Sequence, residues 1–195
     1  MDKINPAIIE SRALEARRII MRHAHETPLD RSATLSKQSG ATVYLKLENL
    51  QKTGSFKARG ALYKLYLLRK EGVRGVVAAS AGNHAQGVAY AASVHGLEAV
   101  IVMPENASPA KVNATAGYGA KVILHGDVVD ESLAEALRIS RETGYPLVHP
   151  FNDPDIISGN ATIGLEILEQ LGDVDVVLVP IGGGGLISGI AAVLK

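Results

Sequence analysis

The amino-acid sequence predicts an α/β fold in which parallel strands are covered by helices on both faces. Short apolar runs alternate with longer segments from residue 75 onward. Several of the longer segments are followed by a glycine, as helices often are. The 195 residues are 47% hydrophobic, which is enough for one sizeable domain or two small ones.

The N-terminal part is expected to begin with a helix over residues 5–24. Asn5 can cap this helix, and Pro6 suits its first turn. Pro28 favours an extended turn at residues 27–29, after this helix. A short helix is expected over 32–40, ending at its glycine, and residues 43–47 alternate like a strand.

The rest of the chain alternates between the two kinds of element. The expected strands are 75–79, 99–103, 121–124, 146–149 and 174–179, and the expected helices are 61–68, 83–95, 108–116, 129–143, 156–171 and one that begins near Leu186. Active sites in such folds lie at the carboxyl ends of the strands. Three glycine-containing loops therefore stand out: the loop before residue 61, residues 80–87 and residues 182–185.

Composition excludes several kinds of partner and site. With 20 basic and 20 acidic residues the formal net charge is +0, which argues against nucleic acid or an anionic membrane as main partner. There is no cysteine, so disulfides and thiolate metal sites are excluded, no metal site is expected, and a cytoplasmic location fits. Residues 176–194 are uncharged and long enough for a membrane span, but Pro180 and the glycine run would break a single helix.

Lys57 lies in the sequence Ser-Phe-Lys-Ala-Arg-Gly (residues 55–60), between a strand-like and a helix-like run. A side chain at such a turn can project into a cleft. The positive end of the helix dipole disfavours a protonated ammonium there, and a neutral lysine can act as nucleophile or base. The alternative is a surface lysine in a first helical turn.

The four glycines 182–185 and Leu186 follow a predicted strand and precede a helix. Consecutive glycines let backbone N–H groups approach an anion, so a phosphate is the expected guest. The alternative is a glycine-rich turn that merely packs tightly. Neither a nucleotide P-loop nor a dinucleotide fingerprint fits, because the required lysine and glycine spacings are absent.

The loop at residues 80–87 offers free N–H groups for a second anion, such as a substrate carboxylate. Asn83 can donate a hydrogen bond to a phenolate-like oxygen. Alternatively, Ser80 and Asn83 only cap the helix, and His84 is more often structural than catalytic. A reactive lysine, a phosphate cradle and a second anion site together indicate pyridoxal 5'-phosphate.

Residues 47–61 (Leu-Glu-Asn-Leu-Gln-Lys-Thr-Gly-Ser-Phe-Lys-Ala-Arg-Gly-Ala) resemble the cofactor-lysine motif of threonine dehydratases (threonine ammonia-lyases) and serine racemases, which are fold-type II pyridoxal phosphate enzymes. Residues 80–84 resemble their substrate-carboxylate loop, and residues 180–186 their phosphate loop. Residues 27–29 and 149–154 match as well, so the resemblance covers essentially the whole chain.

The resemblance implies a role for each motif residue. Lys57 would form the Schiff base and then remove the substrate Cα proton, and Phe56 would pack beside the cofactor ring. The cofactor-binding residues would be Phe56, Lys57, Asn83, Gly182, Gly183, Gly184, Gly185 and Leu186. The residues around the substrate would be Ser80, Ala81, Gly82, Asn83 and His84.

The implied reaction is β-elimination of L-threonine to 2-oxobutanoate, or of L-serine to pyruvate, with release of ammonia. Racemases of the family carry a serine where this chain has Ala81, and a methyl group cannot transfer a proton, which favours a dehydratase. Serine racemase, a related fold-type II enzyme and a truncated non-catalytic homologue stay as alternatives.

The resemblance also implies a division of the chain. Residues 1–47 and 147–195 would belong to a larger, incomplete cofactor domain, and residues 48–146 to a smaller α/β domain. Family members continue beyond the position of Lys195, so the chain is expected to be a fragment of a homodimer or homotetramer, and its activity alone stays open. Residues 159–162 (Gly-Asn-Ala-Thr) depart from the usual Gly-Gln-Gly-Thr, at an expected helix start.

Overall fold

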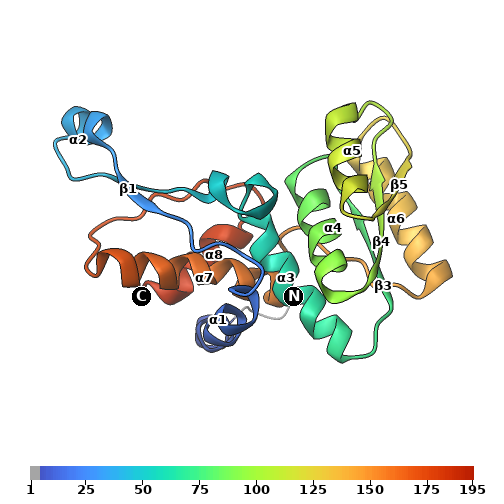
Figure 1. Cartoon of the computed structure of the whole chain (residues 1–195), viewed down its shortest axis with the longest axis horizontal. Helices are drawn as coiled ribbons and strands as arrows, with labels where there is room; N and C mark the ends of the chain where they lie inside the picture. The colour runs from blue at the N-terminus through green and yellow to red at the C-terminus, as the bar shows by residue number, and fades with distance from the viewer. Residues whose placement is uncertain (1–4) are drawn as a thin grey trace.

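The computed structural model describes residues 5–195 (Figure 1). The helices are α1 (Pro6–Ile20), α2 (Ala33–Ser39), α3 (Lys57–Lys70), α4 (Asn83–His95), α5 (Pro109–Gly117), α6 (Val129–Thr143), α7 (Pro154–Leu171) and α8 (Gly185–Val193), with 3-10 turns η1 (Glu48–Leu50) and η2 (Lys52–Gly54). The strands are β1 (Leu29–Arg31), β2 (Tyr44–Lys46), β3 (Gly75–Ala79), β4 (Glu98–Met103) and β5 (Lys121–Leu124).

A parallel sheet in the order β3-β4-β5 lies at the right of Figure 1. Side chains of a strand point alternately to its two faces. Val76 and Ala78 accordingly join the core with α4, whereas Val77 and Ala79 join a second cluster with α6. Helices therefore cover both faces of this sheet, as the sequence predicts.

The other half of the molecule is mainly helical. Helices α1, α7 and α8 pack together, and β1 and β2 form a two-stranded antiparallel ribbon beside them. Helix α3 lies between the halves and packs on both α4 and α7 (Figure 1). The first turn of α3 thus stands where segments from both halves meet.

Helix signals in the sequence are confirmed at several ends. Asn5 Oδ1 accepts a hydrogen bond from the Ala7 N–H at 3.0 Å, as predicted for a cap. Ser32, expected as the first residue of its helix, instead caps α2, because its Oγ accepts from the Leu35 N–H at 3.3 Å. Gly40, Gly96 and Gly144 end their helices with positive φ, which favours glycine.

Three expectations are wrong. Residues 174–179 form no strand, because no strand of the described residues 5–195 pairs with them; Val176 is 74% exposed and Leu178 is 92% exposed. Residues 146–149 contribute only an isolated bridge between Leu147 and Val77. Helix α7 begins at Pro154, so residues 159–162 lie buried inside the helix rather than at its start.

No helix in the described part of the chain combines the length and the apolar composition needed to cross a membrane. The division into domains at residues 47 and 147 stays a prediction.

Candidate active site

Lys57 is the first residue of α3, which begins four residues earlier than the expected helix over 61–68. Its side chain is partly enclosed, and its Nζ donates a hydrogen bond to the Pro150 carbonyl oxygen at 2.6 Å. Loss of solvent lowers the pKa of the Lys57 ammonium. No carboxylate of residues 5–195 forms an ion pair with this lysine. Burial therefore shifts this amine toward the neutral, nucleophilic form relative to an exposed lysine.

The backbone just before Lys57 is held in an unusual conformation. Thr53 has φ of 64°, a region that β-branched residues rarely occupy. Its hydroxyl oxygen is buried and has no hydrogen-bond partner among the described residues. Such strain persists only where the surroundings enforce it, and here it shapes the turn that presents Phe56 and Lys57. The Phe56 ring centroid lies 5.3 Å from Lys57 Nζ.

A buried ionic cluster lies behind this turn. Arg59, which is fully buried, donates to both carboxylate oxygens of Glu48 (2.7 and 2.8 Å) and of Glu166 (2.5 and 2.9 Å). Lys46 Nζ lies 2.6 Å from Glu166 Oε2. Two cations and two carboxylates balance in this cluster, which ties α3 to β2, η1 and α7.

The first turn of α4 carries the second predicted anion loop. Ser80 Oγ accepts from the Gly82 N–H at 3.1 Å, and neither Ser80 nor Asn83 provides α4 with a side-chain cap. The capping alternative is therefore not what the structure shows. Asn83 is exposed, so its amide is accessible, and the first N–H groups of the helix have no intrahelical partner.

His84 makes a structural contact, in line with the expectation that this residue is structural rather than catalytic. Its ring is buried, and Nε2 lies 2.9 Å from the Val148 carbonyl oxygen. A carbonyl only accepts, so Nε2 carries the proton. Burial lowers the pKa of His84 to about 4, and the ring is therefore neutral at neutral pH.

The glycine loop requires glycine at two positions in particular. A Cβ on Gly183 would lie 2.3 Å from the Phe151 ring, and a Cβ on Gly185 would lie 2.8 Å from the Phe151 carbonyl oxygen. Gly184 has φ of 85° and stands at the N-cap position of α8 without a side-chain cap. Backbone N–H groups at this end of α8 are left for an anion.

The segment from Val148 to Phe151 brings the three loops together. Val148 receives the His84 hydrogen bond, Pro150 receives that of Lys57, and Phe151 packs against the glycine loop. A Cβ on Gly87 of α4 would lie 3.0 Å from the Lys57 backbone, so α4 packs closely against the start of α3. No hydrogen bond joins Ser80, Asn83 or Leu186 to Lys57 within the described residues.

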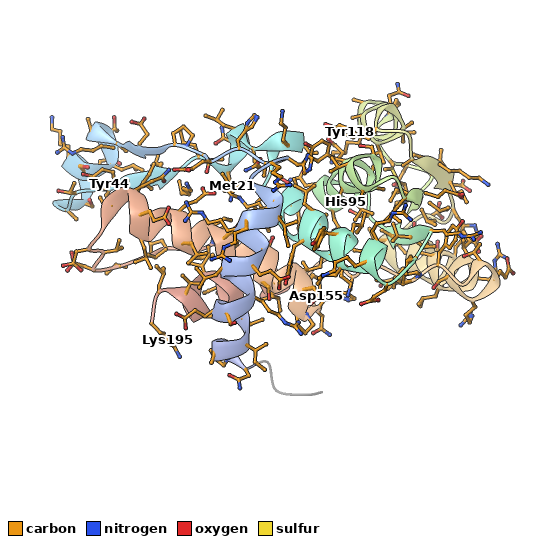
Figure 2. All side chains as sticks on the ribbon, turned by 60° about the horizontal axis from the view of Figure 1, so that its bottom comes forward. Met21, Tyr44, His95, Tyr118, Asp155 and Lys195 are labelled. Atoms are coloured by element: carbon orange, nitrogen blue, oxygen red, sulfur yellow. The ribbon has the colours of Figure 1, made fainter. Side chains whose placement is uncertain are left out.

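These residues fit pyridoxal 5'-phosphate. The cofactor needs an amine that is free of carboxylate partners, which Lys57 offers, and a phosphate anchor, which the glycine cradle at the N-terminus of α8 offers. Asp155, labelled in Figure 2, lies outside the candidate site. It forms ion pairs with Arg12 and Lys64 where α1, α3 and α7 meet. Asp155 is therefore paired with cations outside the candidate site.

These features define an α/β protein in which the segment 148–151 links a partly buried lysine to a glycine loop at the start of a helix. The chain belongs to the family described as pyridoxal-phosphate dependent enzymes, whose model matches residues 20–195. An L-threonine ammonia-lyase of Thermotoga maritima is 56% identical over 182 residues, covering 93% of this chain and 45% of the relative. The chain spans about half the length of the curated relatives it matches.

Two solved structures extend this similarity. The processed form of threonine deaminase isoform 2 from Solanum lycopersicum superposes with a TM-score of 0.91 at 40% identity, over 99% of this chain and 53% of that one. Maize serine racemase superposes with a TM-score of 0.92 at 40% identity, over 95% and 57%. The predicted family resemblance, fold-type II architecture and cofactor are confirmed.

Sequence reasoning missed four contributors to the site. The Pro150 carbonyl is a backbone group with no residue signature, and Thr53 shows its strain only in three dimensions. Glu48 and Glu166 lie 11 and 107 residues from Arg59. Glu166 did leave a signal, because it is a charged residue on the otherwise apolar face of α7 that also carries Ile163 and Ile167.

Proposed function

We propose that this chain carries the cofactor-binding lysine of an ammonia-lyase that converts L-threonine, L-serine or both to a 2-oxo acid and ammonia. The observation that carries the proposal is the surroundings of Lys57. Its amine is desolvated, has a neutral carbonyl as its acceptor, and is linked through Phe151 to the glycine loop. Similarity to the threonine ammonia-lyase and threonine deaminase supports the substrate class.

Lys57 has two tasks in this proposal. Its Nζ would hold the cofactor, and the same amine would take the proton from the substrate Cα. The bound cofactor supplies an electron sink for the charge left on Cα. The Pro150 carbonyl, which lies 2.6 Å from Nζ, orients the amine, and the burial that lowers the pKa of Lys57 favours the form that accepts a proton.

The remaining site residues would bind and orient. The N–H groups of Gly182, Gly183, Gly184, Gly185 and Leu186 would hold the phosphate. The first turn of α4, with Ser80, Ala81, Gly82 and His84, would hold the substrate carboxylate, and the exposed Asn83 amide would donate to the ring oxygen. Phe56 would pack beside the ring.

Serine racemase is the second candidate, favoured by the high TM-score of the maize enzyme. Racemisation needs an acid on the second face of Cα. Ala81 offers none, so elimination is the proposed main reaction. Racemisation at a rate comparable with elimination would reverse this order.

Finer aspects belong to the same proposal. The whole protein would work in the cytoplasm as a homodimer or homotetramer, with a small amino acid as its substrate and without nucleic acid or membrane as partner. Use of threonine would fit isoleucine biosynthesis or threonine catabolism. Residues 1–47 and 147–195 would form the larger domain, and 48–146 the smaller one.

Titration with pyridoxal 5'-phosphate, followed by visible absorption, tests the proposal. The chain should develop a band of bound cofactor that Lys57→Ala abolishes and Lys111→Ala, on the exposed surface of α5, leaves intact. The band should shift on addition of threonine or serine. If neither this chain nor a version extended to the length of its relatives gives a Lys57-dependent band, the proposal is wrong.

A further inference from the structure

A tight turn over His149, Pro150, Phe151 and Asn152, hereafter the 149–152 turn, lies at the centre of the site. None of these residues was assigned a role from the sequence beyond matching the family. The turn supplies the acceptor for Lys57 and the aromatic ring that packs on the glycine loop. A residue that fixes the shape of this turn therefore also fixes the acceptor for Lys57 and the ring that packs on the glycine loop.

The His149 ring closes this turn on itself. Its Nδ1 lies 3.3 Å from the Phe151 nitrogen and 2.9 Å from the Asn152 nitrogen. Backbone N–H groups only donate, so Nδ1 must be the unprotonated acceptor and the proton of the neutral ring is on Nε2. The ring also stands edge-on to Phe151, with centroids 4.7 Å apart and planes at 89°.

We propose that His149 is a positioning residue whose neutral imidazole holds the 149–152 turn, and through it the Lys57 amine and the glycine loop, in the arrangement that the cofactor needs. The inference deepens the proposed function, because it concerns how that site is held. A protonated ring would turn an N–H toward two other N–H groups, so protonation opens the turn.

The charged groups around His149 support a neutral ring. Burial lowers the pKa of His149, Asp153 at the start of α7 opposes this, and the Lys57 cation from α3 adds to the lowering. His84 from α4 is the other titratable neighbour, and it stays neutral. His149 therefore keeps its acceptor to a lower pH than an ordinary histidine does.

Two substitutions separate the role of His149 as a hydrogen-bond acceptor from its change of charge with pH. In His149→Asn the side-chain Oδ1 can occupy the place of Nδ1 and accept the same hydrogen bonds, but it does not titrate. His149→Ala removes the acceptor. His125→Asn, at an exposed histidine after β5, is the matched control.

The test follows two signals in the chain without cofactor, by NMR between pH 8 and pH 5. Amide hydrogen exchange of Phe151 and Asn152 reports the turn, and the 13Cε signal of Lys57, assigned with Lys57→Arg, reports the amine. His149→Ala should speed the exchange of both amides by about fivefold, the equivalent of one hydrogen bond, and move the Lys57 signal to the position of exposed lysines.

His149→Asn should keep both signals as in the unsubstituted chain at pH 8, and should also keep them as the pH falls through the range in which the unsubstituted chain loses them. If His149→Asn behaves as His149→Ala, or if neither changes either signal, the inference is wrong. If His149→Ala does not fold, the pH profile of His149→Asn decides alone. Because no cofactor is present, these results are independent of whether the proposed activity is found.

Discussion

The molecule buries lysines in two contrasting ways. Lys46 lies in the ionic cluster, where Glu166, the Thr27 carbonyl and Gln170 all accept from its amine. Lys57, only eleven residues further along the chain, has the neutral Pro150 carbonyl and no carboxylate. The first arrangement keeps a charge to hold α3, α7 and β2 together, and the second leaves an amine ready to react. Surroundings, rather than residue type, separate a structural from a reactive lysine.

The largest effect is expected from breaking the charge balance of the ionic cluster. Glu166→Gln leaves Arg59 and Lys46 with Glu48 as the sole carboxylate, and an uncompensated buried charge costs about 3–5 kcal/mol. Urea unfolding would measure the loss in free energy of unfolding. Glu169→Gln, which breaks an exposed pair with Arg17, is the control and should cost no more than about 1 kcal/mol.

The second prediction concerns how the stability of the region around Lys57 depends on pH. The pKa of His84 is lowered to about 4, so the folded state binds its proton later than the unfolded state does. The stability from the neutral ring is present above about pH 6.5 and is lost as the pH falls toward 4, by about 3 kcal/mol. Unfolding curves between pH 8 and 4 would measure it.

His84→Gln keeps a donor for the Val148 carbonyl but removes the titration, so its stability should fall less over that pH range. His125→Gln, at an exposed position, is the control and should follow the unsubstituted chain. Equal acid sensitivity of His84→Gln and the control would contradict the buried neutral ring.

A third, smaller effect is expected in the glycine loop. Gly183→Ala places a methyl group against the Phe151 ring, and such overpacking costs about 1–3 kcal/mol. Cofactor affinity should weaken, because Phe151 adjoins the Pro150 carbonyl that holds Lys57. Absorption titration measures the affinity. Gly117→Ala, where a Cβ meets nothing within 4 Å, should leave it unchanged; equal affinities in both variants would show that the loop tolerates the methyl group.

The smallest effect on stability is expected at Lys57 itself. Lys57→Met removes a desolvated amine that has no ion pair, so the free energy of unfolding should change by less than about 1 kcal/mol. Lys46→Met should cost more, because it leaves Glu166 with Arg59 as its sole cation. Urea unfolding of both variants sharpens the comparison, and a larger loss for Lys57→Met would reverse it.

Local patterns predicted much of this fold. Residues 75–143 were assigned almost to the residue, because glycines end the helices and apolar runs mark strands that are buried on both faces. Residues 174–179 are as apolar as β3, yet they remain unpaired, with Val176 and Leu178 exposed and three valines half-buried against α7 and α8. A strand depends on its neighbour, which no local pattern specifies.

The same distinction holds for the candidate site. Lys57 and the glycine loop were predicted, because their chemistry depends on residue type and on position at a helix start. The Pro150 carbonyl and the pairing of Arg59 with Glu166 were not, because one is a backbone group and the other joins residues 107 positions apart. The sequence thus predicted where Lys57 and the glycine loop lie in the fold, but not the groups that hold them in place.

The most direct measurement of the central claim is to identify the lysine that carries the cofactor. The chain would be incubated with pyridoxal 5'-phosphate, reduced with sodium borohydride, digested and mapped by mass spectrometry. Lys57 should be modified at low cofactor concentration, ahead of the exposed lysines and of Lys46, because its pKa is lowered and its amine has no carboxylate partner. Preferential modification of any other lysine would contradict the account.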